Sequence, residues 1–271
     1  MKQNFRYRKS VAVFALMVVM GLAQAHEFWM QPIKFFLKPG EHLVVSFKVG
    51  ENFMGEPWDM TTHKIERLDL LHGSESRSVR DSVMPGKKNN LSVLLKQEGT
   101  HLLVMQSDNA FIGMEGDKFN EYLKEDGLDE VFEQRKKTNT LTKPSREYFT
   151  RFSKLLVQVG KTTDDTFGQV AGFPVEVVPE SNPYAAKIGD VIRYKILHDG
   201  KPVFGAKVRV WNRWDNRTTI QNIYTEKNGT IEAIVSNPGM WMVSVVRMVP
   251  ATKEGAEWQS YWASLTFGIR Q

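Results

Sequence analysis

The sequence predicts a mainly β protein with two β-sandwich domains and one small α-helical insertion. Two observations predict this class. Along most of the chain, short runs rich in β-branched and aromatic residues alternate with Gly, Pro and Asn turn signals. One stretch, residues 117–137, instead places its apolar residues at helical spacing. A protein with this pattern buries the apolar faces of its sheets against one another and carries the helical segment as an addition.

In the N-terminal half we expect four strands, each bounded by turn residues. They cover residues 41–49, 64–71, 91–95 and 100–107. The last two are expected to form a hairpin whose loop contains Gly99. Residues 145–159 are predicted as a further strand. A helix stays open there as an alternative, because Tyr148, Phe152 and Leu155 also fit a helical stripe.

The helical insertion is predicted over residues 117–137. Its apolar side chains recur at helical spacing: Phe119, Tyr122, Leu123, Leu128, Val131 and Phe132. Gly127 is expected to separate two short helices, because glycine weakens a helix interior. The many charged residues of this segment are expected to form a solvated face.

The last ninety residues are expected to form a compact β-sandwich. Strands are predicted at 190–197, 206–213, 218–225, 230–235, 241–248 and 258–267. Asp199-Gly200, Asn228-Gly229 and Pro238-Gly239 supply turns between them. Short strands separated by regular turns are typical of sandwiches. Trp241 is expected in the core of this sandwich.

The N-terminus has the pattern of an export signal. A basic segment with Lys2, Arg6, Arg8 and Lys9 precedes an apolar run at 11–22. Ala23 and Ala25 then satisfy the small-x-small cleavage rule. The apolar run is short for a membrane span, which needs about 20 residues. We therefore expect residues 1–25 to be cleaved and the mature protein, with His26 first, to be periplasmic and not membrane-spanning.

Composition excludes several functions. Removing residues 1–25 removes four basic and no acidic residues, so the net charge falls by four from +5 to +1. A chain with that balance offers no electrostatic case for binding nucleic acid. The sequence contains no cysteine, which excludes thiolate metal sites and thiol catalysis.

Two sets of motifs carry a resemblance to known families. The sequence GKPVFGAKV at 200–208, with TEKNG at 225–229 and PGMWMVS at 238–244, resembles carboxypeptidase-regulatory-like and transthyretin-like modules. This resemblance implies an Ig-like C-terminal sandwich over residues 181–271. The hinge-like Asn182-Pro183 pair then separates it from an N-terminal domain over 26–180.

The whole mature chain resembles an exported family often labelled the NikM-like periplasmic component of cobalt or nickel transport. The matching motifs are HEFW at 26–29, FNEYLKEDGL at 119–128, REYFTR at 146–151 with Lys154, Asn182-Pro183, and WQSYWASLTF at 258–267. The resemblance implies a β-rich protein that handles a divalent transition metal such as nickel, cobalt or copper. A membrane metal transporter is the partner that it implies.

His26 is the first candidate metal ligand. Once it is the N-terminal residue, its α-amine and its ring Nδ1 can chelate one ion, and Cu(II), Ni(II) and Zn(II) accept such nitrogen ligands. The alternative is that His26 lies on a frayed terminus. Phe28 and Trp29 favour the ordered reading, because they tie this end of the chain to an apolar surface.

A third ligand must come from elsewhere in the fold. His101 is our first choice, because it starts an apolar strand, and His63 is the second. No HxH, HxxxH or HExxH spacing supports either one. We assign no catalytic residues and expect a metal-binding or uptake protein rather than an enzyme. A copper monooxygenase with an N-terminal histidine brace is one alternative. A carbohydrate-binding or adhesion sandwich that uses its tryptophans is another.

Overall fold

The computed structural model describes residues 26–270, so the predicted leader at 1–25 lies outside the described residues. The model is 53% strand and 12% helical, which confirms the mainly β class and the β-sandwich prediction. Within residues 26–270, no helix is long and apolar enough to cross a membrane. Three sheets make up the structure, and we refer to them as sheets A, B and C.

Sheet A is four-stranded and lies in the N-terminal half. Its strands are β1 (Glu27–Pro32), β3 (Glu41–Glu51), β4 (Met54–Pro57) and β7 (Leu91–Leu95). β3 is the central strand, because β1, β4 and β7 all pair with it antiparallel. The apolar residues of β3 alternate along the strand, so one face of β3 is buried and the other is more exposed.

Sheet B is ten-stranded and runs through both halves of the molecule. Eight strands follow the order β15 (Arg217–Tyr224), β14 (Lys207–Trp214), β17 (Gly239–Pro250), β18 (Trp258–Ile269), β10 (Ser145–Val159), β8 (Gly99–Ser107), β5 (Ile65–His72) and β6 (Glu75–Ser78). The short strands β2 (Phe36–Leu37) and β9 (Ala110–Met114) also pair with β10. β10 and β18 pair in parallel. The predicted domains 26–180 and 181–271 therefore share one sheet.

Sheet C covers the C-terminal half. Its strands are β11 (Val175–Pro179), β12 (Val191–His198), β13 (Lys201–Pro202) and β16 (Thr230–Ile234). β11 belongs by sequence to the N-terminal range but pairs with β12. The connections contain three short 3-10 helices, η1 (Arg80–Ser82), η2 (Asp165–Gly168) and η3 (Pro183–Ala185).

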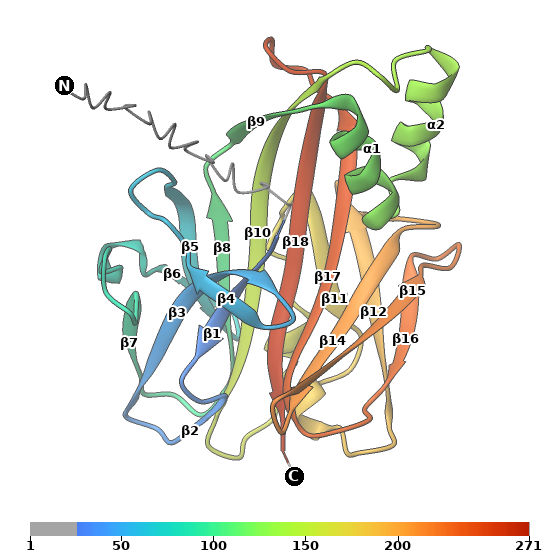
Figure 1. Cartoon of the computed structure of the whole chain (residues 1–271). Helices are drawn as coiled ribbons and strands as arrows, with labels where there is room; N and C mark the ends of the chain where they lie inside the picture. The colour runs from blue at the N-terminus through green and yellow to red at the C-terminus, as the bar shows by residue number, and fades with distance from the viewer. Residues whose placement is uncertain (1–25, 271) are drawn as a thin grey trace, which may run out of the picture.

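Sheet B is the middle layer of the structure. Along β10, Phe152 and Leu156 join the core that sheet C covers, whereas Leu155 and Val157 join the core that sheet A covers. A strand buried on both faces reads as a continuous apolar run. This explains why residues 145–159 also matched a helical stripe; the strand prediction is confirmed and the helical alternative is wrong. In Figure 1 the blue strands of sheet A cross in front of β10 and β18.

The helical insertion is confirmed as α1 (Gly116–Glu125) and α2 (Asp129–Lys137). Its apolar residues pack on β17 and β18, where the Tyr122 ring stacks on Trp262 with centroids 5.9 Å apart. Gly127 lies between the helices with φ +68°, and a Cβ there would lie 2.5 Å from Cβ of Lys207. Only glycine allows the turn to approach β14 this closely.

The predicted hairpin of 91–95 and 100–107 is wrong. β7 pairs with β3 in sheet A, and β8 pairs with β5 and β10 in sheet B. The connection at 96–98, directly before Gly99, crosses from one layer to the other. The alternation of apolar residues predicts a strand but not its partner, because both sheets offer an apolar face to the same core.

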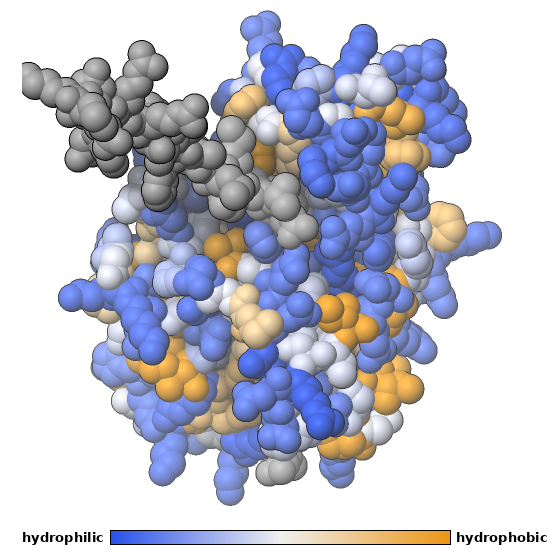
Figure 2. Space-filling view, in the orientation of Figure 1, coloured by the Kyte–Doolittle hydropathy of each residue, from blue (hydrophilic) through white to orange (hydrophobic). Residues whose placement is uncertain are grey.

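The surface seen in Figure 2 is mainly hydrophilic, with separate rather than continuous apolar patches.

Candidate functional site

The described chain begins at His26, directly before β1, and this strand is deeply buried. Phe28, Trp29 and Met30 are at most 3% exposed, and Glu27 is 5% exposed. The hydroxyl of Ser264 donates to the carbonyl of Phe28 over 2.8 Å, which ties β1 to sheet B. His26 itself is partly exposed. The backbone is thus held in place up to the residue that follows His26.

The carboxylate of Glu27 is bound within the protein. Nη1 of Arg209 lies 3.3 Å from its Oε1, and the hydroxyl of Ser244 donates to the same oxygen over 2.9 Å. Nε1 of Trp211 in turn donates to Ser244 over 2.9 Å. Burial raises the pKa of Glu27, and Arg209 opposes that rise. Arg209 lies on β14 of sheet B and therefore anchors β1 of sheet A to sheet B.

Arg209 also binds the turn between the two helices. Its Nη1 pairs with the carboxylate of Asp126, and its Nη2 donates to the carbonyl of Glu125 over 2.8 Å. The Nζ of Lys207 donates to the same carbonyl over 2.7 Å. Burial raises the pKa of Asp126 to about 7, although Arg209 acts in the opposite direction. The close approach at Gly127 places this turn on β14.

Glu147 is a third buried acid, at the start of β10. Its Oε1 accepts hydrogen bonds from the phenol of Tyr122, over 3.2 Å, and from the hydroxyl of Ser260. Nε1 of Trp262 donates to Ser260 over 3.0 Å. Oε2 of Glu147 has no hydrogen-bond partner among residues 26–270. Burial raises the pKa of Glu147 to about 7, despite the two hydrogen bonds that it accepts.

Arg151, also on β10, carries a positive charge that acts on Glu147 and Glu27. Its guanidinium lies over the ring of Phe149 at 4.8 Å, and burial lowers its pKa to about 10 against the attraction of Asp108, Glu27 and Glu147. We refer to Glu27, Asp126, Glu147, Arg151 and Arg209 as the acid–arginine cluster. The cavity beside Glu27 and Asp126 holds about 10 Å³, which is room for one water molecule at most. The cluster can hold charges and protons but does not admit a substrate.

His63 lies at the same end of the sandwich as His26. Its ring stacks on Trp58 with centroids 5.5 Å apart, and Trp58 meets the ring of Phe28 edge-on at 5.2 Å. Nδ1 of His63 is 3.5 Å from Oδ1 of Asp108. The ring of Phe149 lies 6.1 Å from the ring of His63 and 4.8 Å from the guanidinium of Arg151, so His63 is close to the acid–arginine cluster.

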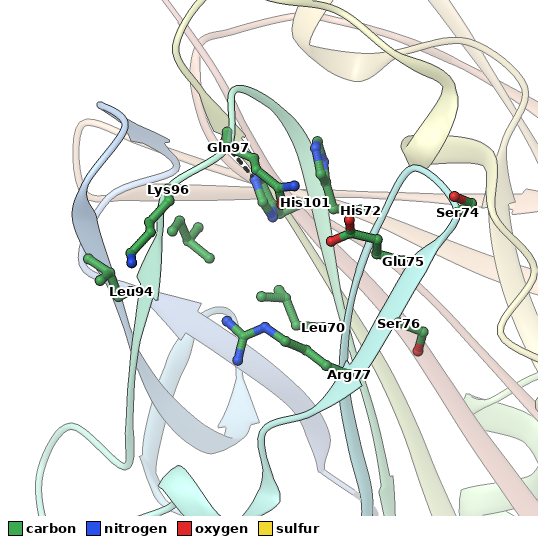
Figure 3. A pocket seen from close by; sticks show the side chains of 11 residues that line it. Leu70, His72, Ser74, Glu75, Ser76, Arg77, Leu94, Lys96, Gln97 and His101 are labelled. Atoms are coloured by element: carbon green, nitrogen blue, oxygen red, sulfur yellow. Dashed lines mark hydrogen bonds between the residues drawn. The ribbon is translucent and has the colours of Figure 1, made fainter.

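His101 lies at the opposite end of the sandwich. It pairs with Val157 on β10, whereas Ser264, which holds the start of β1, bonds to Ser153. Ser264 holds Phe28, and His26 precedes Phe28 by two residues, so about six strand residues, or about 20 Å, separate the two histidines along the sheet. Figure 3 shows His101 beside His72 in a pocket. The structure thus brings His63, but not His101, to the end that contains His26.

The sequence analysis missed the acid–arginine cluster. The signal was present as two charged residues, Glu147 and Arg151, four residues apart and so on the same face of a predicted strand. Glu27 gave no such signal, because it follows the cleavage motif. Within the described part of the chain, no three side chains of His, Cys, Asp or Glu are grouped so as to hold a metal ion. The ligand assignments therefore stay predictions.

Fold and site together define a β-sandwich protein whose first strand is held over a buried cluster of acids and arginines. The chain belongs to the family described as domain of unknown function (DUF4198), whose model matches residues 23–248. Among the curated proteins, none matches the chain significantly.

Solved structures give low similarity. Escherichia coli alpha-2-macroglobulin activated by porcine elastase is 12% identical with a TM-score of 0.23, over 92% of this chain and 22% of that chain. The chain therefore spans about a fifth of that protein. Three N-terminal domains of the highly immunogenic outer capsid protein of bacteriophage RB49 are 8% identical with a TM-score of 0.22, over 91% of this chain and 71% of that chain. At these TM-scores neither similarity carries an argument.

The buried acid Glu147 makes stability depend on pH. Between its ordinary pKa of 4.5 and its raised pKa of about 7, the folded state keeps a proton that the unfolded state has lost. The protonated side chain of Glu147 contributes its full stability below pH 4.5. This contribution falls by about 1.4 kcal/mol per pH unit as the pH rises from 4.5 to about 7. Relative to the wild type, Glu147→Gln should therefore gain about 3 kcal/mol in free energy of unfolding between about pH 4 and about pH 8.

Urea unfolding at both pH values measures this difference. Glu257→Gln is the matched control, because Glu257 is largely exposed and its hydrogen bond with Arg146 lowers its pKa. That control should show no gain at high pH. A Glu147→Gln variant whose stability difference from the wild type does not change with pH would show that folding does not raise the pKa of Glu147.

Proposed function

We propose that the exported protein begins at His26 and binds one divalent transition-metal ion, nickel, cobalt or copper, as a periplasmic metal-binding or uptake protein. The α-amine and the ring Nδ1 of His26 are the primary ligands. The observation that carries this proposal is the burial of the residues that follow His26, from Glu27 to Met30. A terminal chelate needs such a fixed position to recruit a further ligand from the fold.

This burial disfavours the frayed-terminus alternative. A mobile terminus loses backbone freedom when it binds a metal, at about 1–2 kcal/mol per ordered residue. Here β1 is already ordered, and Glu27 is held by Arg209 and Ser244. His26 is partly exposed, so its nitrogens can reach an ion from solvent. In this proposal the acid–arginine cluster anchors β1, and the metal ligands lie outside this cluster.

His63 is the better candidate for the ligand from the fold. Asp108 lies next to its Nδ1, and a carboxylate at one ring nitrogen commonly orients a histidine whose other nitrogen binds a metal. Nε2 of His63 is then the donor. His101 has Nε2 beside the carbonyl of Gln97 and lies at the other end of the sandwich. The structure thus favours His63 over His101, in the reverse of the order that the sequence favoured.

Sequence resemblance supports the transport role. The motif HEFW at 26–29 and the other motifs shared with the NikM-like family point to a membrane metal transporter as the partner. The motif GKPVFGAKV at 200–208 supports an Ig-like module in the C-terminal half.

Calorimetric titration of Ni(II), Co(II) and Cu(II) tests the proposal. One sample starts at His26, released from a fusion by a protease that leaves no extra residue, and a matched sample carries one alanine before His26. We expect about one equivalent of metal to bind the first sample and at least tenfold weaker binding to the second, because the added residue moves the free amine away from the ring. Equal binding to both samples would place the metal elsewhere.

Two substitutions test the ligand from the fold. His63→Gln should weaken binding to the sample that starts at His26 by at least tenfold, whereas His101→Gln should leave it unchanged. The reverse result would restore His101 as the ligand. A copper-loaded sample that consumes ascorbate and oxygen would instead support the copper monooxygenase.

A further inference from the structure

A groove of about 780 Å³ lies where sheets A and B diverge, far from His26. β5, β6 and β8 form one wall, and β7 with the connection that follows it forms the other. Figure 3 shows Arg77 and Glu75 on the first wall and Lys96 on the second, with His101 and His72 at one end. The apolar lining of the groove consists of Leu70 and Leu95, which are buried, and of Leu94, which is 37% exposed.

His72 and His101 form a stacked pair at the end of the groove. Their ring centroids are 4.3 Å apart, and the ring planes differ by 11°. Nδ1 of His72 lies 3.0 Å from the carbonyl of Thr100, and Nε2 of His101 lies 3.0 Å from the carbonyl of Gln97. A carbonyl only accepts, so these two nitrogens carry the hydrogens. Nε2 of His72 and Nδ1 of His101 are then hydrogen-bond acceptors.

His101 lines the groove, and one of its ring nitrogens is an acceptor without a hydrogen-bond partner among residues 26–270. The residue is 2% exposed, and this nitrogen is Nδ1. Burial lowers the pKa of His101, and the adjacent His72 lowers it further. The ring is therefore neutral at neutral pH, and Nδ1 accepts a hydrogen bond rather than donating one. A ligand that satisfies it must carry an O–H or N–H donor.

The charges on the walls favour an anion. Arg77 and Lys96 face the groove from its two sides, against the single acid Glu75. Neither cation forms an ion pair within the described part of the chain. An arginine fork suits a carboxylate in particular.

The stacked rings do not suit a metal ion. The lone pair of each ring nitrogen lies in the plane of its ring. The two ring planes are nearly parallel and the ring centroids are 4.3 Å apart, so no single ion lies in both planes at about 2 Å from both nitrogens. We propose that this groove binds a small hydroxylated carboxylate. Its carboxylate groups lie between Arg77 and Lys96, and its hydroxyl donates to Nδ1 of His101.

Citrate and tricarballylate are matched probes, because tricarballylate is citrate without the hydroxyl group. Calorimetric titration into metal-depleted protein in metal-free buffer keeps this test separate from metal binding at His26. We expect citrate to bind about one equivalent and tricarballylate to bind at least tenfold more weakly, because only citrate satisfies Nδ1 of His101. Absence of citrate binding, or equal binding of both probes, would overturn the proposal.

Two variants locate the site. Arg77→Gln, on the exposed strand β6, should weaken citrate binding at least tenfold, while Lys88→Gln, on an exposed loop outside the groove, should not. His101→Phe keeps the stacked ring but removes the acceptor, so citrate and tricarballylate should bind it equally. If His101→Phe does not fold, the Arg77→Gln result decides alone. Citrate binding that Lys88→Gln weakens as much as Arg77→Gln would show a nonspecific polyanion effect and overturn the proposal.

Discussion

Replacing Arg209 with methionine is expected to lower the free energy of unfolding by about 3–5 kcal/mol at pH 8. Arg209 is the cation that pairs with both Glu27 and Asp126. Without it, two buried carboxylates lose their partner, and the first strand and the helical turn lose their shared anchor on β14. Removing one side of a buried ion pair costs this much because the remaining charge stays out of water.

The loss should be smaller at pH 5. Burial already raises the pKa of Glu27 and Asp126, and without Arg209 both groups can take up a proton as the pH falls. Urea unfolding of Arg209→Met at both pH values measures this change. Arg193→Met is the matched control, because Arg193 forms an exposed pair with Glu232 that should contribute about 1 kcal/mol or less. A loss as small as that of the control would show that the acid–arginine cluster does not anchor β1.

The second large effect is expected at Lys154, in the middle of β10. Its Nζ lies 2.5 Å from Oε2 of Glu176, and both side chains are at most 3% exposed. Glu176 also accepts hydrogen bonds from the backbone N–H groups of Ala171 and Phe173, each over 2.8 Å. Lys154 on β10 is thus linked to Glu176 on β11 and, through the Glu176 carboxylate, to the loop before β11. Lys154→Met should lower the free energy of unfolding by about 3–5 kcal/mol at neutral pH, because Glu176 is left buried without its cation.

A double variant separates the lost attraction from the remaining charge. Lys154→Met combined with Glu176→Gln removes the charge and keeps an acceptor for one of the two backbone N–H groups, which bond to different oxygens of Glu176. It should recover part of the loss, so the two substitutions should not add, since groups in direct contact are coupled. Thermal and urea unfolding of the two single variants and the double variant measure the coupling. Additive effects would show that the ion pair contributes no attraction to the fold.

Most of the helices and strands could be predicted from the sequence, because the spacing of apolar residues shows which face of a helix or strand is buried. The helical insertion appeared through the spacing of Phe119, Leu123 and Val131, with Gly127 between its helices. The six C-terminal strands also matched, because runs rich in β-branched and aromatic residues lie between turn signals. β1 was missed as a strand, since its residues are buried almost throughout and show no alternation.

The partners of the strands could not be predicted in the same way. β7 and β8 are separated by a short connection, yet they lie in different sheets. Both sequences present an apolar face to a common core, so the pattern is the same in either sheet. Which edge each strand joins depends on sheet A packing over β10, a contact between residues far apart in the chain.

For the candidate sites the division is similar. The sequence by itself determined that His26 precedes a run of apolar residues and that no cysteine chemistry is available, because these are properties of neighbouring residues and of composition. Only the tertiary structure decided that Arg209 joins Glu27 to Asp126, that His63 lies at the end of the sandwich that contains His26, and that His101 stacks on His72. The physical reason is that these groups are distant in sequence. Only the packing of the three sheets sets the distances between them, and burial in that packing raises the pKa of Glu27 and Asp126 and lowers the pKa of His101.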